Sequence, residues 1–219
     1  MNNVTRAFFA LLRCGLWGRE PENPEMLHLA AEDWNSIYRE SRRQTVTGIV
    51  HSGLSFIPEE FLPDEGLMSK WTAAAFRIEQ ASRKMDAIVA GVAGKFLGLG
   101  LHPVLLKGQA AARLYREPLL RECGDIDLYF ADRAEWREAV ETLAKEGTAL
   151  SRVADGSCHY ETDGVVVELH GKMMDICNPF RQKWLKELEP QFCFDVAEIG
   201  GGRINTPSPE LNMLLMSSH

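Results

Sequence analysis

The spacing of apolar residues divides the chain into a helical first part and a second part of mixed type. The stretch from Val4 to Trp17 is amphipathic, and the stretch from Glu25 to Glu40 carries its apolar residues on one helical face. The longest pattern runs from Lys70 to about Leu97, with apolar positions at steps of three and four, and Ser69 is placed to cap it. We therefore expect residues 1–100 to form a helical N-terminal region.

Short apolar runs and alternating runs of the strand type begin after residue 100. Strands are predicted at residues 104–106, 126–130, 150–154, 159–162, 165–170, 192–198 and 203–205. Helices are predicted at residues 109–115, 133–146 and 180–188. The dipeptide Asp163-Gly164 suits a type I′ turn, so it predicts a hairpin between the two strands that flank it.

This order of elements predicts an α+β fold in which a small mixed β-sheet is backed by helices. We expect the core domain to span residues 101–206 and a C-terminal helical segment to begin within residues 207–219. No helix stop signal precedes His219, so we expect the chain to be truncated from a longer protein.

The composition is that of a globular protein. Of the 219 residues, 45% are hydrophobic and 25% are charged, which argues against disorder, collagen and coiled coil. No apolar run approaches the roughly 18 residues that a membrane span needs, so a transmembrane protein is excluded. The net charge of -7 argues against stable binding of nucleic acid through a basic surface.

The cysteines and the N-terminal segment both bear on the cellular location. The five cysteines form no CxxC pair and have no zinc-site spacing, which fits a reduced compartment. Arg6 and Arg13 interrupt the apolar N-terminal run, and no small-residue cleavage site follows, so a packing helix is favoured over a signal peptide. We expect a cytoplasmic protein.

Two acidic residues, Asp125 and Asp127, occupy alternate positions of a predicted strand. Side chains alternate between the faces of a strand, so both carboxylates point the same way while Ile126 and Leu128 point into the core. Two carboxylates on one face repel each other, and a hard cation such as Mg²⁺ removes that cost. The alternative is a Gly-Asp turn followed by a solvated Asp127, and a D-x-D pattern alone does not decide between the two.

A third carboxylate, Glu168, interrupts the strongly β-forming run from Val165 to His170. Glu168 and His170 share one face of this strand. If the strand pairs with the strand at 126–130, Glu168 completes a three-acid metal site. The alternative is an ordinary edge strand with its polar face in water.

The dipeptide Lys107-Gly108 follows the first predicted strand and opens a helix. Such a turn presents backbone N–H groups to a phosphate, and Lys107 adds a positive charge. Arg121 precedes the acids and is a candidate phosphate contact or a brace for them. His170 is a candidate base, phosphate contact, brace or structural residue. His159 has no evident partner in the sequence.

The run LLKGQAAARLYREPLLRECGDIDLYF, followed by VVVELH, resembles an uncharacterised bacterial nucleotidyltransferase family of the DNA polymerase β-like superfamily. The matching residues are Leu106, Lys107, Gly108, Tyr115, Pro118, Arg121 and Asp125 to Leu128. The superfamily usually has Gly-Ser at the turn, where this chain has Gly108-Gln109.

The resemblance implies a site that binds a nucleoside triphosphate and two Mg²⁺ ions, with Mn²⁺ as an alternative ion. Asp125, Asp127 and Glu168 would be the catalytic and metal-binding residues. Lys107, Gly108, Arg121 and His170 would be the nucleotide-binding residues. A substrate hydroxyl would attack the α-phosphate, and pyrophosphate would leave.

Three functions follow as hypotheses. The first is a Mg-dependent nucleotidyltransferase that modifies a hydroxyl of a small-molecule or protein acceptor. The second is a non-catalytic nucleotide-binding or interaction module that keeps the fold. The third is an antitoxin-like nucleotidyltransferase that modifies a toxin partner or its RNA. The expected partners are a nucleoside triphosphate and an unidentified small-molecule or protein acceptor. We expect neither membrane binding nor stable binding of nucleic acid.

Overall fold

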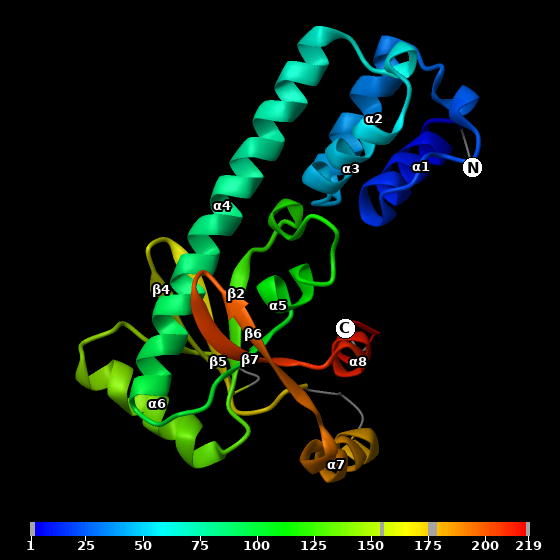
Figure 1. The fold of residues 1–219 in the computed structure, drawn as a ribbon. Helices are drawn as coiled ribbons and strands as arrows, with labels where there is room; N and C mark the ends of the chain where they lie inside the picture. The colour runs from blue at the N-terminus through cyan, green and yellow to red at the C-terminus, as the bar shows by residue number, and fades with distance from the viewer. Residues whose placement is uncertain (1–2, 154–155, 175–178, 218–219) are drawn as a thin grey trace. The chain divides into compact units, whose positions relative to one another are not determined.

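A computed structural model describes residues 3–153, 156–174 and 179–217. Its contacts divide the chain into two compact units. The helical unit comprises residues 1–83 and 112–122, and the sheet unit comprises residues 84–111 and 123–219. Figure 1 shows the fold and labels helices and strands of both units. In the described ranges, no helix combines the length and apolar character needed to cross a membrane. The predicted domain limits at residues 100 and 206 stay a prediction.

The helical unit contains α1 (Asn3–Trp17), α2 (Ala31–Arg43), α3 (Thr47–Gly53), the first part of α4 (Glu65–Gly98) and 3-10 turns at Pro24–Leu27, Leu54–Phe56, Glu59–Phe61 and Pro118–Leu120. Trp71 of α4 is fully buried at its centre and donates a hydrogen bond from Nε1 to Thr47 O at 3.0 Å. Helices α1 and α3 approach closely at Gly53, where a Cβ atom would lie 2.2 Å from Leu11 O. Only glycine permits this approach.

Two local predictions in the helical unit were wrong. The helix expected from Glu25 to Glu40 is a short turn followed by α2, because His28 has a ψ of 85°, outside the helical range. Helix α4 begins at Glu65 rather than at Lys70. Asp64 Oδ1 accepts a hydrogen bond from the Leu67 amide at 3.0 Å, so Asp64 satisfies a free N–H of the first turn and Ser69 lies inside the helix.

The sheet unit confirms the predicted α+β fold. Its strands are β1 (Val104–Leu106), β2 (Asp125–Tyr129), β3 (Ser151–Arg152), β4 (Cys158–Thr162), β5 (Val165–His170), β6 (Phe194–Ile199) and β7 (Gly202–Pro207). They form one mixed sheet in the order β3-β4-β5-β2-β1-β7-β6. The remaining elements are α5 (Gly108–Ala112), α6 (Arg133–Lys145), α7 (Pro179–Leu188), a 3-10 turn at Glu189–Gln191 and α8 (Pro209–Ser217). Ala154 and residues 218–219, at the ends of two predicted elements, lie outside the described residues.

Three strand pairings at the centre of the sheet position the polar residues. Strands β2 and β5 are parallel, with Asp127 opposite Glu168. Strand β1 is antiparallel to β2 and places Leu106 opposite Asp127. Strands β4 and β5 form the predicted hairpin, in which Asp163 and Gly164 have φ values of 51° and 75°, as a type I′ turn requires.

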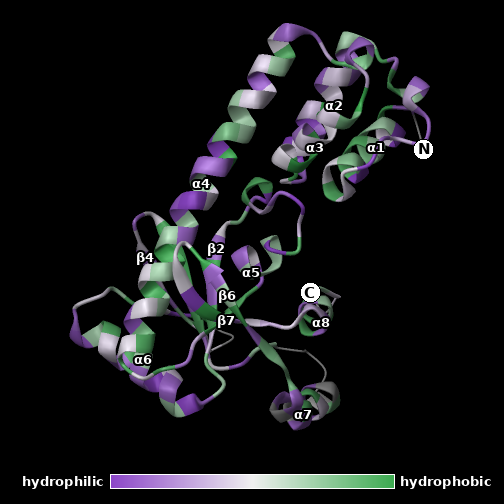
Figure 2. Ribbon diagram, in the orientation of Figure 1, coloured by the Kyte–Doolittle hydropathy of each residue, from purple (hydrophilic) through white to green (hydrophobic). Residues whose placement is uncertain are grey.

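The central strands have a covered face and an acid face. The covered face carries four fully buried residues, Ile126, Leu128, Val167 and Leu169. They belong to one apolar cluster together with residues of α6 and of the part of α4 after Arg83. Figure 2 shows hydrophobic and hydrophilic residues alternating along α4, as this packing requires. The acid face carries the alternate residues of the same strands, including Asp127 and Glu168. A second apolar cluster around Tyr129 and Leu106 occupies part of it.

Candidate functional site

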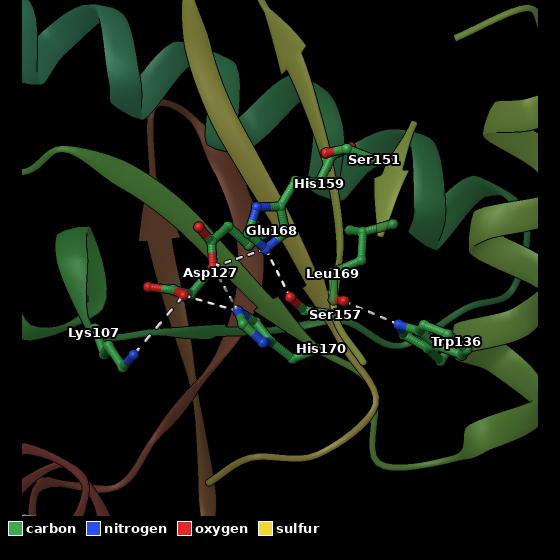
Figure 3. A network of polar contacts seen from close by, with 9 residues as sticks. All are labelled: Lys107, Asp127, Trp136, Ser151, Ser157, His159, Glu168, Leu169 and His170. Carbon is green, nitrogen blue, oxygen red and sulfur yellow. Dashed lines mark hydrogen bonds and ion pairs between the residues drawn. The ribbon is translucent and has the colours of Figure 1, made fainter. Parts of the chain in front are cut away.

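The carboxylates of Asp127 and Glu168 and the imidazole of His170 converge on the acid face (Figure 3). His170 Nε2 lies 2.9 Å from Asp127 Oδ1 and 3.4 Å from Glu168 Oε2. One ligand atom from each of the three residues lies within 4.8 Å of the others. Asp127 is buried, with 4% of its surface exposed, and the other two side chains are half-buried. We call these three residues the acid–imidazole cluster.

The strand pattern explains why these side chains meet. The parallel register of β2 and β5 places Asp127 beside Glu168. His170 lies two residues beyond Glu168 and therefore on the same face of β5. The sequence analysis made the meeting of Glu168 and Asp127 conditional on the pairing of β5 with β2, and the two strands do pair. The three-acid metal site stays a prediction.

His159 and Ser157 form a second layer behind Glu168. His159 lies opposite Glu168 in the β4–β5 pair, and its Nε2 is 3.4 Å from Glu168 Oε2. The same nitrogen shares a hydrogen bond with Ser157 Oγ at 2.7 Å. The prediction that His159 has no partner was wrong. The Asp163-Gly164 turn could have predicted this contact, because a two-residue hairpin loop fixes the register of the two strands and sets His159 opposite Glu168.

The turn between β1 and α5 brings a cation to the cluster. Lys107 adopts a left-handed conformation with φ of 47°, which costs a non-glycine residue about 1 kcal/mol. Its Nζ lies 4.0 Å from Asp127 Oδ1. Gly108 has φ of 22°, and a Cβ atom on it would lie 3.4 Å from Asp125 O, so the turn packs directly against the start of β2.

Gln109 follows this turn and points inward. Only 4% of its surface is exposed, and among the described residues neither polar atom of its amide has a hydrogen-bond partner. An unsatisfied buried amide costs about 1–3 kcal/mol. The helical conformation of α5 places this polar side chain in the interior.

Negative charge accumulates on the acid face. Burial raises the pKa of Glu168 above its ordinary value, and the nearby charges of Asp127 and Asp125 raise it further. His159 and His170 act in the opposite direction but do not reverse the shift. A bound cation would lower the pKa by favouring the ionised carboxylate. The carboxylate and imidazole donors therefore suit a divalent metal ion.

A cavity of about 450 Å³ opens beside the cluster. Its lining includes Glu168 and His170 together with three cationic side chains, those of Lys107, Arg133 and Lys172. Apolar atoms come from Trp136, Met173 and Met174. Trp136 is held in place by a hydrogen bond from its Nε1 to Leu169 O at 3.0 Å.

Sequence reasoning missed Arg133, Trp136 and Lys172 as cavity residues. Arg133 and Trp136 belong to the first turns of α6, and Lys172 lies two residues after the end of β5. Each resembles an ordinary surface or packing residue in the sequence. A partial signal existed for Lys172, since it lies two residues after His170 and just beyond the end of the acid-bearing strand.

Two further predicted site residues are placed differently. Asp125 is exposed at the start of β2 and lies outside the acid–imidazole cluster, although its charge acts on Glu168. Arg121 belongs to the helical unit, where its guanidinium carbon lies 5.8 Å from the centre of the Tyr115 ring. Their roles in binding metal and nucleotide stay predictions.

The comparison with protein families gives one match. A family model described as "Uncharacterised nucleotidyltransferase" matches residues 30–219, a range that includes the cluster, the Lys107 turn and most of the helical unit. The resemblance inferred from the sequence is therefore confirmed at the level of the family. No curated protein and no solved structure matches the chain.

Proposed function

Because the chain belongs to the family of uncharacterised nucleotidyltransferases, we propose that it moves a nucleoside monophosphate from a triphosphate to a hydroxyl group. The acceptor is a small molecule or a protein. The observation that carries this proposal is the pairing of Asp127 and Glu168 on adjacent strands beside a cavity lined by cations. The carboxylates suit the metal, and the cations suit the phosphates.

Asp127 and Glu168 would hold the metal, and Asp125 would join them as the resemblance implies. The ions are Mg²⁺, or Mn²⁺ in its place. When bound, they neutralise phosphate charge and lower the pKa of the attacking hydroxyl. Burial first, and then the charges of Asp127 and Asp125, raise the pKa of Glu168, and a bound cation would oppose this shift.

The cationic side chains at the cavity would bind the triphosphate. Lys107 lies next to Asp127, and Arg133 and Lys172 also line the cavity. Arginine binds phosphate through paired N–H groups, while lysine acts as a point charge. The turn at Gly108 would offer backbone N–H groups, and Arg121 would add a further charge as the resemblance implies. Trp136 and Met173 would form an apolar wall for the nucleoside.

The reaction is a displacement at the α-phosphorus. The acceptor oxygen forms a bond to this phosphorus while the bond from phosphorus to the oxygen bridging toward the β-phosphate breaks. Pyrophosphate leaves with the bonding electrons. Glu168 or Asp127 would accept the hydroxyl proton, as general-base catalysis requires.

Pyrophosphate release from ATP, GTP, CTP and UTP tests this proposal, with Mg²⁺ or with EDTA and with candidate acceptors. The substitution Asp127→Ala should abolish metal-dependent release. The matched control Asp195→Ala, at an exposed position of β6, should leave release unchanged. Equal turnover by Asp127→Ala and wild type would refute the proposal.

A second candidate is a non-catalytic nucleotide-binding module. It is favoured by Gln109, whose buried amide stands where the superfamily has a serine, so the turn lacks that hydroxyl contact to nucleotide. This alternative predicts triphosphate binding without pyrophosphate release for every acceptor offered.

A cytoplasmic location is part of the proposal, because nucleoside triphosphates are available there. The four described cysteines, Cys14, Cys123, Cys158 and Cys193, are free thiols, which fits a reduced compartment. Cys177 lies outside the described residues.

A further inference from the structure

His170 lies where a ligand to the metal would lie. Its Nε2 faces Asp127 Oδ1 at 2.9 Å and Glu168 Oε2 at 3.4 Å, so one ring nitrogen is shared by two carboxylates from two strands. Figure 3 shows the three side chains pointing toward one another.

The separations match those of neighbouring ligands around one ion. Octahedral ions of this size have metal–ligand distances of about 2.1 Å, which places adjacent ligand atoms roughly 3 Å apart. The separation of 2.9 Å is a hydrogen bond between His170 Nε2 and Asp127 Oδ1, and Nε2 lies 3.4 Å from Glu168 Oε2. Both distances are close to that value, and a bound ion would take the place of the proton in this hydrogen bond. The three donor atoms already lie within 4.8 Å of one another, so small side-chain rotations suffice to surround an ion.

We propose that His170 binds the metal directly through Nε2, which creates a site of two carboxylates and one imidazole that prefers Mn²⁺ to Mg²⁺. The inference rests on the proposed function for the presence of the ion. To coordinate, the neutral ring carries its proton on Nδ1 and presents the Nε2 lone pair. Imidazole is a ligand of transition metals, whereas Mg²⁺ binds oxygen, and Mn²⁺ accepts both.

His159 provides a matched comparison. Its Nε2 is also 3.4 Å from Glu168 Oε2, and its side chain is about as exposed as that of His170. The same nitrogen is engaged by Ser157 Oγ at 2.7 Å, and His159 is outside the acid–imidazole cluster. We therefore assign His159 to positioning Glu168 rather than to the ion.

Electron paramagnetic resonance of Mn²⁺ tests this assignment on the full chain without nucleotide. Titration gives the Mn²⁺ dissociation constant, and electron spin echo modulation detects a ¹⁴N nucleus bonded to the ion. Wild type should show directly bound nitrogen. His170→Gln should lose this signal and raise the Mn²⁺ dissociation constant by more than about 10-fold, since removing even a residue that only orients a metal ligand typically costs about 10- to 100-fold. Competition by Mg²⁺ should show a smaller change in Mg²⁺ affinity.

The control His159→Gln should keep the nitrogen signal, and circular dichroism should show that both variants fold. Bound Mn²⁺ with only oxygen ligands in wild type would overturn the assignment and leave an oxygen-only metal site, so the proposed function would stand. A nitrogen signal lost in His159→Gln but kept in His170→Gln would also overturn it. No Mn²⁺ binding by wild type would overturn it as well, and metal-dependent pyrophosphate release would then decide the proposed function separately.

Discussion

The two faces of the central strands are built from alternate residues of the same segments, yet their chemistry is opposite. On the covered face, Ile126, Leu128 and Leu169 are fully buried among apolar neighbours. On the acid face, Asp127 is almost as deeply buried but lies beside Glu168. A shift of one residue along a strand therefore separates a purely apolar environment from a pair of carboxylates with Lys107 and His170 beside them.

The covered face therefore stabilises the fold, whereas the acid face provides the candidate functional site. Burial of apolar surface contributes about 25 cal/mol per Å², so the covered face favours folding. Neighbouring carboxylates repel each other and lose hydration, so the acid face opposes folding unless a cation binds. The raised pKa of Glu168 follows from this cost. We infer that substitutions on the two faces affect different measurable quantities.

The largest expected effect is on the acid face. Asp127→Asn keeps the shape of the side chain but removes its charge, so metal-dependent nucleotidyl transfer should fall by about 1000-fold. The free energy of unfolding should change little, because the substitution removes the repulsion from Glu168 together with the attraction to Lys107 and His170. Turnover assays and urea denaturation measure the two quantities. A large fall in the free energy of unfolding, with unchanged turnover per folded molecule, would show that Asp127 serves stability rather than catalysis and would contradict the proposed difference between the two faces.

The neighbouring residue on the covered face should behave in the opposite way. Leu128→Ala creates a cavity in the apolar cluster and should lower the free energy of unfolding by about 3 to 4 kcal/mol. Turnover per folded molecule should change little. Val166→Ala, at an exposed position of β5, is the control and should cost less than about 0.5 kcal/mol. Equal losses in the two variants would show that the covered face is loosely packed.

Each face also carries one buried tyrosine, and this pair predicts an alkaline transition. Burial raises the pKa of Tyr160 on the covered face and of Tyr129 on the acid face to about 12. The contribution of the two tyrosines to stability is complete below pH 10, where they are protonated in both the folded and the unfolded chain. It is lost as pH rises from about 10 to 12, because only the unfolded chain ionises there.

The loss for each tyrosine should reach about 1.4 kcal/mol at pH 11, which is about half of the full loss expected above pH 12. Chemical denaturation at pH 8, 10 and 11 measures it. Tyr160→Phe and Tyr129→Phe should each reduce the decrease of the free energy of unfolding with pH, because phenylalanine does not ionise. If the free energy of unfolding does not change between pH 8 and pH 11, the hydroxyl groups of Tyr129 and Tyr160 are accessible to water and their pKa values are not raised.

The smallest expected effect comes from the second layer of the acid face. Ser157→Ala frees His159, which then holds Glu168 less firmly, so metal affinity should fall by about 10-fold. The melting temperature should change less than that of Leu128→Ala. Calorimetric titration with Mn²⁺ distinguishes the positioning role from a structural one. Unchanged affinity with a lowered melting temperature would assign Ser157 to stability alone.

Much of the sheet could be predicted because its signals are local. The alternation of Val165 to His170 gave the limits of β5 correctly, and Asp163-Gly164 gave the turn before it. The alternation around Asp127 also predicted which residues face the core. In each case a period of two residues or a φ requirement appears within a few positions of the chain.

The rest of the site depends on contacts between distant segments. Arg133 and Lys172 reach the cavity only because α6 and the segment after β5 meet there, and no local pattern encodes that meeting. The position of His170 between two carboxylates depends on the parallel register of β2 and β5. Sequence spacing placed His170 on the right face but could not set its distance from Asp127.

We infer that the acid face is a metal-dependent nucleotide site. Calorimetric titration with ATP, GTP, CTP and UTP, with Mg²⁺ or EDTA, tests this inference on wild type and on Asp125→Ala/Asp127→Ala. At least one triphosphate should bind wild type only when the metal is present, and the double variant should not bind it. Binding that persists without metal or without both acids, or no binding of any triphosphate by wild type, would show that the acid face is not such a site.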